Sequence, residues 1–224
     1  AHKYAQTAMQ LSLYMGLLFA VFSLVFVRQM VGFFNLTDVE AYDAAISYTR
    51  IAYGLIVFSF MTMTLTGVYT AQGDSKTPFL ANLVGLVTNM ILDPLLILGP
   101  GPLPKLGVSG AAIATVTAQF IVMSIMVLDI IWQKKENVLK GIHLIGRMSG
   151  KYLSGICKIG IWGLLITLIF IFTPTPITTI FFHEPSAIAT AVSYLVIIGF
   201  SEAFLCIELT TIGAISGLGK TNLC

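Results

Sequence analysis

The side chains with the clearest chemical potential are acids that lie inside long apolar stretches. Glu202 lies 15 residues after Ala187 and 14 before Ser216, near the middle of one such stretch. A charge at that depth costs about 2.5–3.5 kcal/mol on insertion scales, and such residues usually face protein or water. Desolvation favours a neutral carboxyl group, so Glu202 is a candidate for exchanging a coupling proton. The alternative is a protonated Glu that is hydrogen-bonded to a neighbouring helix.

A second candidate group combines Asn89, Asp93 and Thr115. Asn89 and Asp93 are four residues apart, so they share one face of a helix. Asp93 and Thr115 are both expected about 8–10 Å below the outer ends of successive helices. A carboxylate, an amide and a hydroxyl at one depth would suit a proton or Na⁺ better than a transition metal. The alternative is that Asp93 ends its helix before Pro94 and that Thr115 bonds its own backbone.

Three further residues are candidates for lining a substrate cavity: Glu208, Met61 and Phe58. Glu208 is six residues beyond Glu202, about 9 Å nearer the inner face, and not on the same helix face. The alternative for Glu208 is a lateral hydrogen bond to a neighbouring helix, and the alternative for Met61 and Phe58 is helix packing or lipid contact. The sequence contains no nucleophile–base pattern or metal-ligand cluster, and the three cysteines form no pair. We therefore expect no enzyme activity and no cofactor.

The composition indicates which kind of structure holds these residues in place. Of 224 residues, 57% are hydrophobic and only 10% are charged, whereas a soluble domain has about 25% charged residues. A soluble domain, a disordered chain and a nucleic-acid-binding protein are thereby excluded. Since a spanning helix needs about 20 apolar residues, we predict an all-α polytopic membrane protein with about six spans. The six are Ala8–Val31, Ala44–Thr70, Pro78–Leu98, Val108–Trp132, Ile159–Phe182 and Ala187–Ser216.

Loop charges predict the orientation of these spans. With the N-terminus inside, only Arg28, Arg50 and Lys105 of the 12 basic residues lie outside, as the positive-inside rule favours. Both ends of the chain are then cytoplasmic in the plasma membrane. No signal peptide is evident, so we expect the chain to begin inside a larger protein. The prolines Pro174 and Pro176 predict a kink in the fifth span.

An internal repeat runs through two pairs of spans. Matching residues recur first at an offset of 148 and then at 146, so two residues are lost in the outer loop. The matching pairs are Lys3-Tyr4 with Lys151-Tyr152, Phe33-Phe34 with Phe181-Phe182, and Ser47-Tyr48 with Ser193-Tyr194. Each copy is expected to be a hairpin of the same orientation, as in transporters with two lobes around a cavity. A channel or scaffold built by duplication is the alternative.

Four motifs in order carry a family resemblance: Gly73–Pro78, Asn89–Ile97, Leu106–Thr115 and Gly217–Thr221. Together they resemble the multidrug and toxic compound extrusion (MATE) transporters, which have twelve helices in two lobes. The resemblance implies that this chain supplies the third to sixth helices and then the ninth and tenth. Residues 1–132 would be a partial N-terminal lobe, 133–158 a cytoplasmic linker and 159–224 a partial C-terminal lobe. The other six helices have no counterpart.

The resemblance also implies a function. A MATE-like antiporter exports amphipathic or cationic organic compounds in exchange for H⁺ or Na⁺ by alternating access. Glu202, and Asp93 with Asn89 and Thr115, match positions implicated in cation coupling. The expected partners are a small organic substrate, the ion and membrane lipid, with no nucleic acid, and the complete protein is expected to be a monomer. The alternatives are a lipid-linked oligosaccharide flippase of the same superfamily and a non-transporting membrane scaffold.

Overall fold

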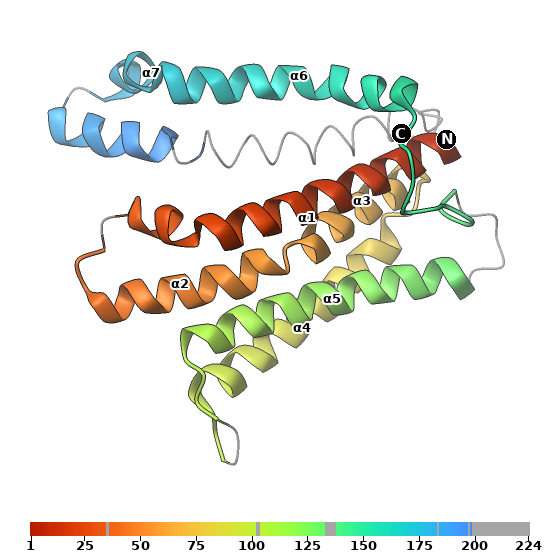
Figure 1. Ribbon diagram of the computed structural model, residues 1–224, viewed down its shortest axis with the longest axis horizontal. Helices are drawn as coiled ribbons and strands as arrows, with labels where there is room; N and C mark the ends of the chain where they lie inside the picture. The colour runs from red at the N-terminus through yellow and green to blue at the C-terminus, as the bar shows by residue number, and fades with distance from the viewer. Residues whose placement is uncertain (35, 102–103, 133–137, 183, 197, 199–224) are drawn as a thin grey trace.

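The computed structural model describes residues 1–34, 36–101, 104–132, 138–182, 184–196 and 198. Every regular element in these ranges is a helix, so the predicted all-α class is confirmed (Figure 1). The helices are α1 (His2–Gly32), α2 (Val39–Gly54), α3 (Val57–Ala71), α4 (Lys76–Leu98), α5 (Val108–Trp132), α6 (Gly150–Phe172) and α7 (Pro174–Phe181). A further helix covers Pro185–Val196.

The described helices make the chain an integral membrane protein. Among the described residues, α1, α4 and α5 are each long and apolar enough to cross a membrane, and α2 with α3 makes a fourth span as a bent pair. The other two predicted spans fall on α6 with α7 and on the helix from Pro185, and most of the last span lies outside the described residues. The predicted break in the fifth span is confirmed, because α6 ends before Thr173 and α7 begins at Pro174.

The predicted span over Ala44–Thr70 is a bent pair of helices, α2 and α3, and not one continuous helix. The chain leaves helical geometry at Leu55, where φ is −115° and ψ is 17°, and α2 and α3 meet at 45°. Gly54 ends α2, and glycine weakens a helix because its backbone has the most conformational freedom to lose. A side chain of α1, Leu24, packs against the bare face of Gly54. The bend therefore lets one long helix, α1, contact both halves.

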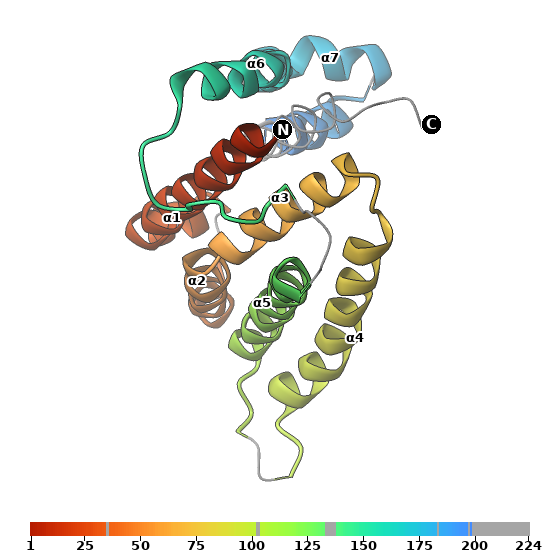
Figure 2. The same cartoon turned by 90° about the vertical axis from the view of Figure 1, so that its right-hand side faces the viewer.

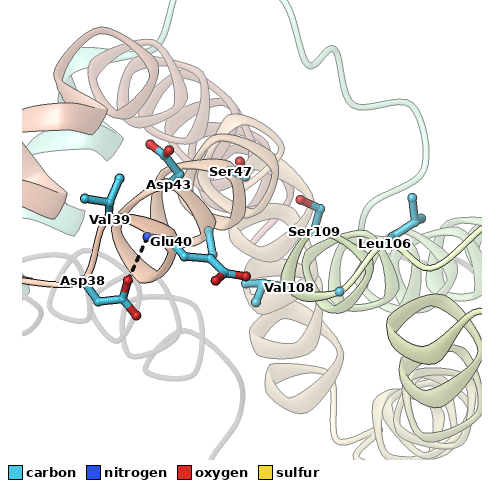
Figure 3. A pocket seen from close by; sticks show the side chains of 10 residues that line it. Asp38, Val39, Glu40, Asp43, Ser47, Leu106, Val108 and Ser109 are labelled. Carbon is cyan, nitrogen blue, oxygen red and sulfur yellow. Dashed lines mark hydrogen bonds between the residues drawn. The ribbon is translucent and has the colours of Figure 1, made fainter.

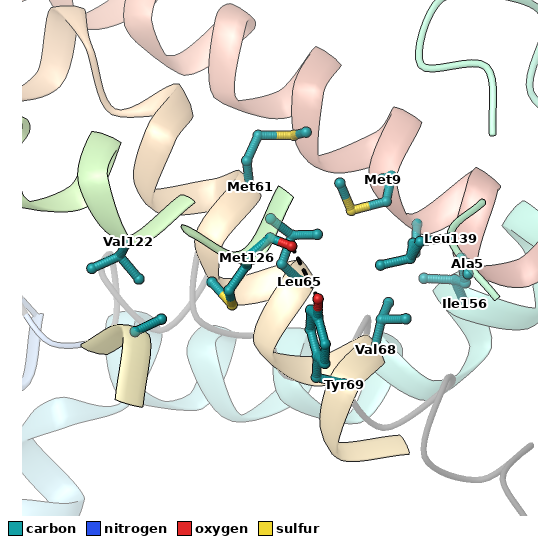
Figure 4. Packing of buried hydrophobic residues seen from close by; sticks show 12 residues of the cluster. Ala5, Met9, Met61, Leu65, Val68, Tyr69, Val122, Met126, Leu139 and Ile156 are labelled. Atoms are coloured by element: carbon teal, nitrogen blue, oxygen red, sulfur yellow. Dashed lines mark hydrogen bonds between the residues drawn. The ribbon is translucent and has the colours of Figure 1, made fainter. Parts of the chain in front are cut away.

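The main apolar core lies where α1, α3 and α5 meet (Figure 4). Leu65 and Tyr69 of α3 are 1% exposed, and Met126 of α5 is fully buried. Ala5 and Met9 close this cluster from α1, and their small or flexible side chains allow close helix approach. This arrangement ties the first, third and fifth helices into one body.

Glycines set the register of the antiparallel pair formed by α4 and α5. Gly85 of α4 lies against the side chain of Val122, and Gly110 of α5 lies against the backbone carbonyl of Leu96. In both places a Cβ atom would collide with the neighbouring helix. The loop after α4 then doubles back, because the amide of Leu106 donates to the Leu96 carbonyl at 3.0 Å. The positions opposite one another in this pair are thereby fixed.

The segment between α5 and α6 is more structured than the polar linker that the sequence predicts. Residues 138–149, here called the strap, run along α1 (Figure 2). Gln10 donates to the His143 carbonyl at 2.8 Å, and the hydroxyl of Tyr14 donates to the Gly146 carbonyl at 3.0 Å. Leu139 is only 4% exposed and joins the main core. The strap therefore links α1 to the start of α6.

Candidate functional site

The predicted site on α4 has two of its three groups in contact. The amide of Asn89 donates to the Asp93 carboxylate at 3.4 Å, and both side chains are partly buried. Their separation of four residues places them on one face of a helix that continues to Leu98 with Pro94 inside it. The alternative that Asp93 ends its helix is therefore wrong. The carboxylate lies within the span, held by an amide of its own helix.

Thr115 lies at a matching depth on α5 but bonds elsewhere. The register of the pair, Gly85 beside Val122 and Gly110 beside Leu96, places Thr115 level with the Asn89–Asp93 turn. Its hydroxyl donates to the Ala111 carbonyl one turn back, at 3.0 Å. In the described part of the chain it makes no hydrogen bond to Asn89 or Asp93. The role of Thr115 in cation binding stays a prediction.

The two residues predicted to flank a cavity in α3 lie in packed surroundings. Met61 is 7% exposed and belongs to the main core. Phe58 is partly buried and lies against Phe120 of α5, with ring centroids 5.2 Å apart in an edge-to-face arrangement. Glu202 and Glu208 lie outside the described residues. Cation coupling by Glu202 and substrate contact by Glu208, Met61 and Phe58 stay predictions.

A pocket of about 800 Å³ opens where the start of α2 meets the start of α5 (Figure 3). Its wall on α2 carries Asp38, Glu40 and Asp43, and its wall on α5 includes Ser109. Asp38 also caps α2, because its carboxylate accepts a hydrogen bond from the backbone amide of Glu40 at 3.0 Å. Nowhere among the residues that the structure describes do three His, Cys, Asp or Glu side chains group as a metal site. The pocket is therefore acidic without metal-site geometry.

One contact between two ionisable side chains of the spans was not predicted from the sequence. The hydroxyl of Tyr69 in α3 lies 2.7 Å from the carboxylate of Asp129 in α5 and donates at 3.0 Å to the Met126 carbonyl. Tyr69 is the largest fully buried side chain among the described residues. An acid three residues before the end of the stretch Val108–Trp132 was the available signal. This contact clamps α3 to α5 at one end of the bundle.

Asp74 lies in the connection between α3 and α4 and stabilises the first turn of α4. Its carboxylate accepts the backbone amide of Thr77 at 3.0 Å and the Thr77 hydroxyl at 2.7 Å. Partial burial acts to raise the pKa of Asp74, but these hydrogen bonds and nearby Lys76 outweigh it and hold the pKa below its usual value. The motif Gly73–Pro78 therefore has a structural role, because it starts a membrane helix.

Comparison with known proteins assigns the first part of the chain to a family. The MatE family model matches residues 1–95. A probable multidrug resistance protein, YoeA of Bacillus subtilis, is 31% identical over 134 residues, which are 60% of this chain and 28% of that protein. A probable multidrug resistance protein, NorM of Bacillus cereus, is 34% identical over 114 residues, 47% of this chain and 25% of that protein.

A third relative has a different name. An FAD transporter of Shewanella oneidensis is 43% identical over 55 residues, which are 25% of this chain and 12% of that protein. The chain thus spans about a quarter or less of the length of these relatives. The ordered motifs, the apolar helices and these matches agree, and together they support a partial MATE family protein.

Proposed function

We propose that the protein is a secondary antiporter that exports amphipathic organic cations in exchange for H⁺ or Na⁺. The observation that carries this proposal is the carboxylate of Asp93, which lies inside a span with the Asn89 amide on it, within the residues matched by the family model. A carboxylate in a span is costly unless it is neutralised or faces a polar partner. Binding a proton or Na⁺ removes that cost.

Ion binding drives a conformational change only if the ion binds one conformation more tightly than the other. Asp93 stands directly before Pro94, which lacks an N–H and leaves the carbonyl of Met90 without its helical partner. The helix is therefore easier to bend at the residue that carries the charge. Neutralising Asp93 would favour the conformation in which this turn is more deeply buried.

Two features support a movement of one half against the other. The residues Tyr4 and Tyr152, which are equivalent in the internal repeat, touch edge to face with ring centroids 4.7 Å apart. Equivalent residues contact one another when they lie near the axis that relates two copies. The bend of 45° between α2 and α3 supplies a joint in the first copy. Rocking about the Tyr4–Tyr152 contact would alternate access to a cavity between the halves.

The charge of the outer pocket favours cations over anions as cargo. Asp38, Glu40 and Asp43 line one wall of it, and a cleft lined by one sign of charge concentrates ions of the other sign. We place this pocket on the outer side, with both ends of the chain in the cytoplasm of a cell whose plasma membrane holds the protein as a monomer. An anionic cargo, such as the FAD named for one relative, is the competing possibility.

The test is transport by the protein reconstituted in proteoliposomes. We expect a fluorescent organic cation to move against an imposed proton or Na⁺ gradient. The coupled transport rate of the Asp93→Asn variant should be at least tenfold lower than that of the wild type. Glu202→Gln is the second variant, and its coupled rate should fall similarly if both acids bind the ion. Glu184→Gln, at an exposed position outside both sites, is the control and should retain coupling.

Three results would contradict the proposal. Unchanged ion-coupled transport by both Asp93→Asn and Glu202→Gln would remove intramembrane acids from the mechanism. Transport of FAD but not of any organic cation would replace the cargo class. A wild-type protein that moves neither compound under either gradient would favour the scaffold alternative.

A further inference from the structure

A second pocket, of about 210 Å³, lies between α1, the strap and the start of α6. Lys3 and Arg147 supply positive charge to its wall, and Gln6, Ser149 and Tyr152 supply polar groups. A pocket of this size is below the 300–1,000 Å³ that drug-sized ligands require. It is suited to a small charged group rather than to the exported compound.

The positive charge in this pocket has no counter-charge among the residues that the structure describes. In the part of the chain that the structure describes, neither Lys3 nor Arg147 forms an ion pair. Arg147 lies three residues before the start of α6. The positive end of the dipole of α6 disfavours a cation there, and α6 has no acid in its first turn. An anion would relieve this repulsion.

The walls of the pocket are held in place by other groups. The amides of Gln6 and Gln10 both donate to the His143 carbonyl, at 3.4 and 2.8 Å. Gln10 is 2% exposed, and Tyr152 is fixed by its contact with Tyr4. The strap is therefore attached to α1 through its backbone. The charged ends of Lys3 and Arg147 remain available for a ligand.

We propose that this pocket binds a phosphate group. Arg and Lys side chains bind phosphate through charge-assisted hydrogen bonds, and the N-terminus of α6, a helix of 23 residues, adds free backbone N–H groups. Ser149 precedes α6 without a side-chain capping bond. The site joins residues of both repeat copies and of the strap, so the bound phosphate would hold the two halves together at this end.

The phosphate group has two possible sources. α1 leaves helical geometry at Phe26, and the part before this kink is about 36 Å long, whereas the hydrocarbon core is about 30 Å thick. About one turn of this part therefore extends beyond the hydrocarbon. A phosphate at Lys3 would lie at the level of lipid headgroups and also within reach of soluble anions.

The experiment measures phosphate binding by the purified protein in a maltoside detergent, which carries no phosphate. Inorganic phosphate is titrated by calorimetry at constant ionic strength, and phosphatidylglycerol retained by the protein is counted by native mass spectrometry. We expect Lys3→Gln and Arg147→Gln to weaken binding of the preferred probe at least tenfold, about 1.4 kcal/mol. Circular dichroism of each variant confirms that it is folded.

The matched control is Lys151→Gln. Lys151 is the repeat equivalent of Lys3 and lies exposed in the first turn of α6, outside the lining of the pocket. It should change binding less than twofold. Binding of inorganic phosphate would assign a soluble ligand, and retention of the lipid alone would assign a headgroup. Binding of neither probe, or an equal loss in Lys151→Gln, would overturn the proposal.

Discussion

The two hairpins of the internal repeat agree in their helix limits and differ in their burial. Helix α2 and the helix from Pro185 begin 146 residues apart. This offset matches that of the repeated sequence after the outer loop. The first hairpin buries Val27, Val31 and Ile46 to 8% exposure or less, whereas Ile180 and Tyr194 of the second are 72% and 64% exposed.

The two copies also agree at the first turn of their second helices. The amide of Tyr42 donates to the Asp38 carbonyl, and 146 residues on the amide of Ile188 donates to the Glu184 carbonyl, both at 3.0 Å. The two residues are therefore lost in the outer loop that joins the two helices of each copy. Local sequence thus determines where each helix begins and ends. Burial depends instead on α5, which packs against α2 and α3 of the first copy, on the opposite side of α1 from α6 (Figures 1 and 2).

The largest expected effect comes from separating α5 from α4. Gly110→Val places a side chain where the Leu96 carbonyl lies, and overpacking of this kind costs about 1–3 kcal/mol. Unfolding in mixed micelles followed by circular dichroism should show a loss near the top of that range. Gly150→Val, at the start of α6 where the space is open, is the control and should lose little. Equal losses would mean that the close approach of α4 and α5 is not important for stability.

The next effect compares equivalent positions in the two copies. Ile46→Ala removes a side chain that is 8% exposed and packed with Val27 and Val31. Its counterpart, Val192→Ala, alters a partly exposed position in the second hairpin. Truncation in a packed site leaves a cavity and costs about 2 kcal/mol or more, so the Ile46 variant should unfold first. A larger loss in Val192→Ala would show that the second hairpin is the better packed of the two.

A smaller effect is expected from the clamp between α3 and α5. Tyr69→Phe leaves the Asp129 carboxylate and the Met126 carbonyl without the buried hydroxyl, at a cost of about 1–2 kcal/mol. Tyr194→Phe, at an exposed site of the second hairpin, should be neutral. The same unfolding assay distinguishes them. Indistinguishable curves for the two variants would show that the buried contact contributes nothing net.

The smallest effect is a pH dependence that belongs to the first half alone. Hydrogen bonds to the carboxylate lower the pKa of Asp74 in the folded state. The contribution of Asp74 to the free energy of unfolding is therefore complete above its unfolded pKa of about 3.9. It is lost as the pH falls through the lower folded value. Hydrogen exchange at the start of α4 should therefore rise in acid. Asp74→Asn should lack this acid step, and its persistence in that variant would assign the step to another group.

Much of this structure is readable from local sequence. The limits of α5, Val108–Trp132, match the predicted span, because a long apolar run bounded by glycine and polar residues leaves no alternative in a membrane. The break at Pro174 follows from the missing N–H of proline. The repeat is visible because it conserves residue types at constant offsets. Features that depend on one chain segment at a time were therefore predicted.

The features that were missed depend on contacts between distant segments. The bend after Gly54 lies beside Leu24 of α1, and a single glycine in an apolar run does not predict a bend. The strap is held through its backbone carbonyls by Gln10 and Tyr14, and carbonyls are common to every residue. The Asn89–Asp93 contact was predictable because both residues lie on one helix. Thr115 required the rotation of α5, which spacing along the chain does not determine.

The central claim is that the two hairpins cross the membrane in the same direction, as two halves around a shared cavity require. The most direct test replaces the native cysteines with serine and introduces single cysteines at Thr37, Ser186 and Leu144. Labelling with a membrane-impermeant thiol reagent in intact cells should modify positions 37 and 186 but modify position 144 only after the membrane is opened. Labelling of 37 and 186 from opposite sides of the membrane would contradict the account.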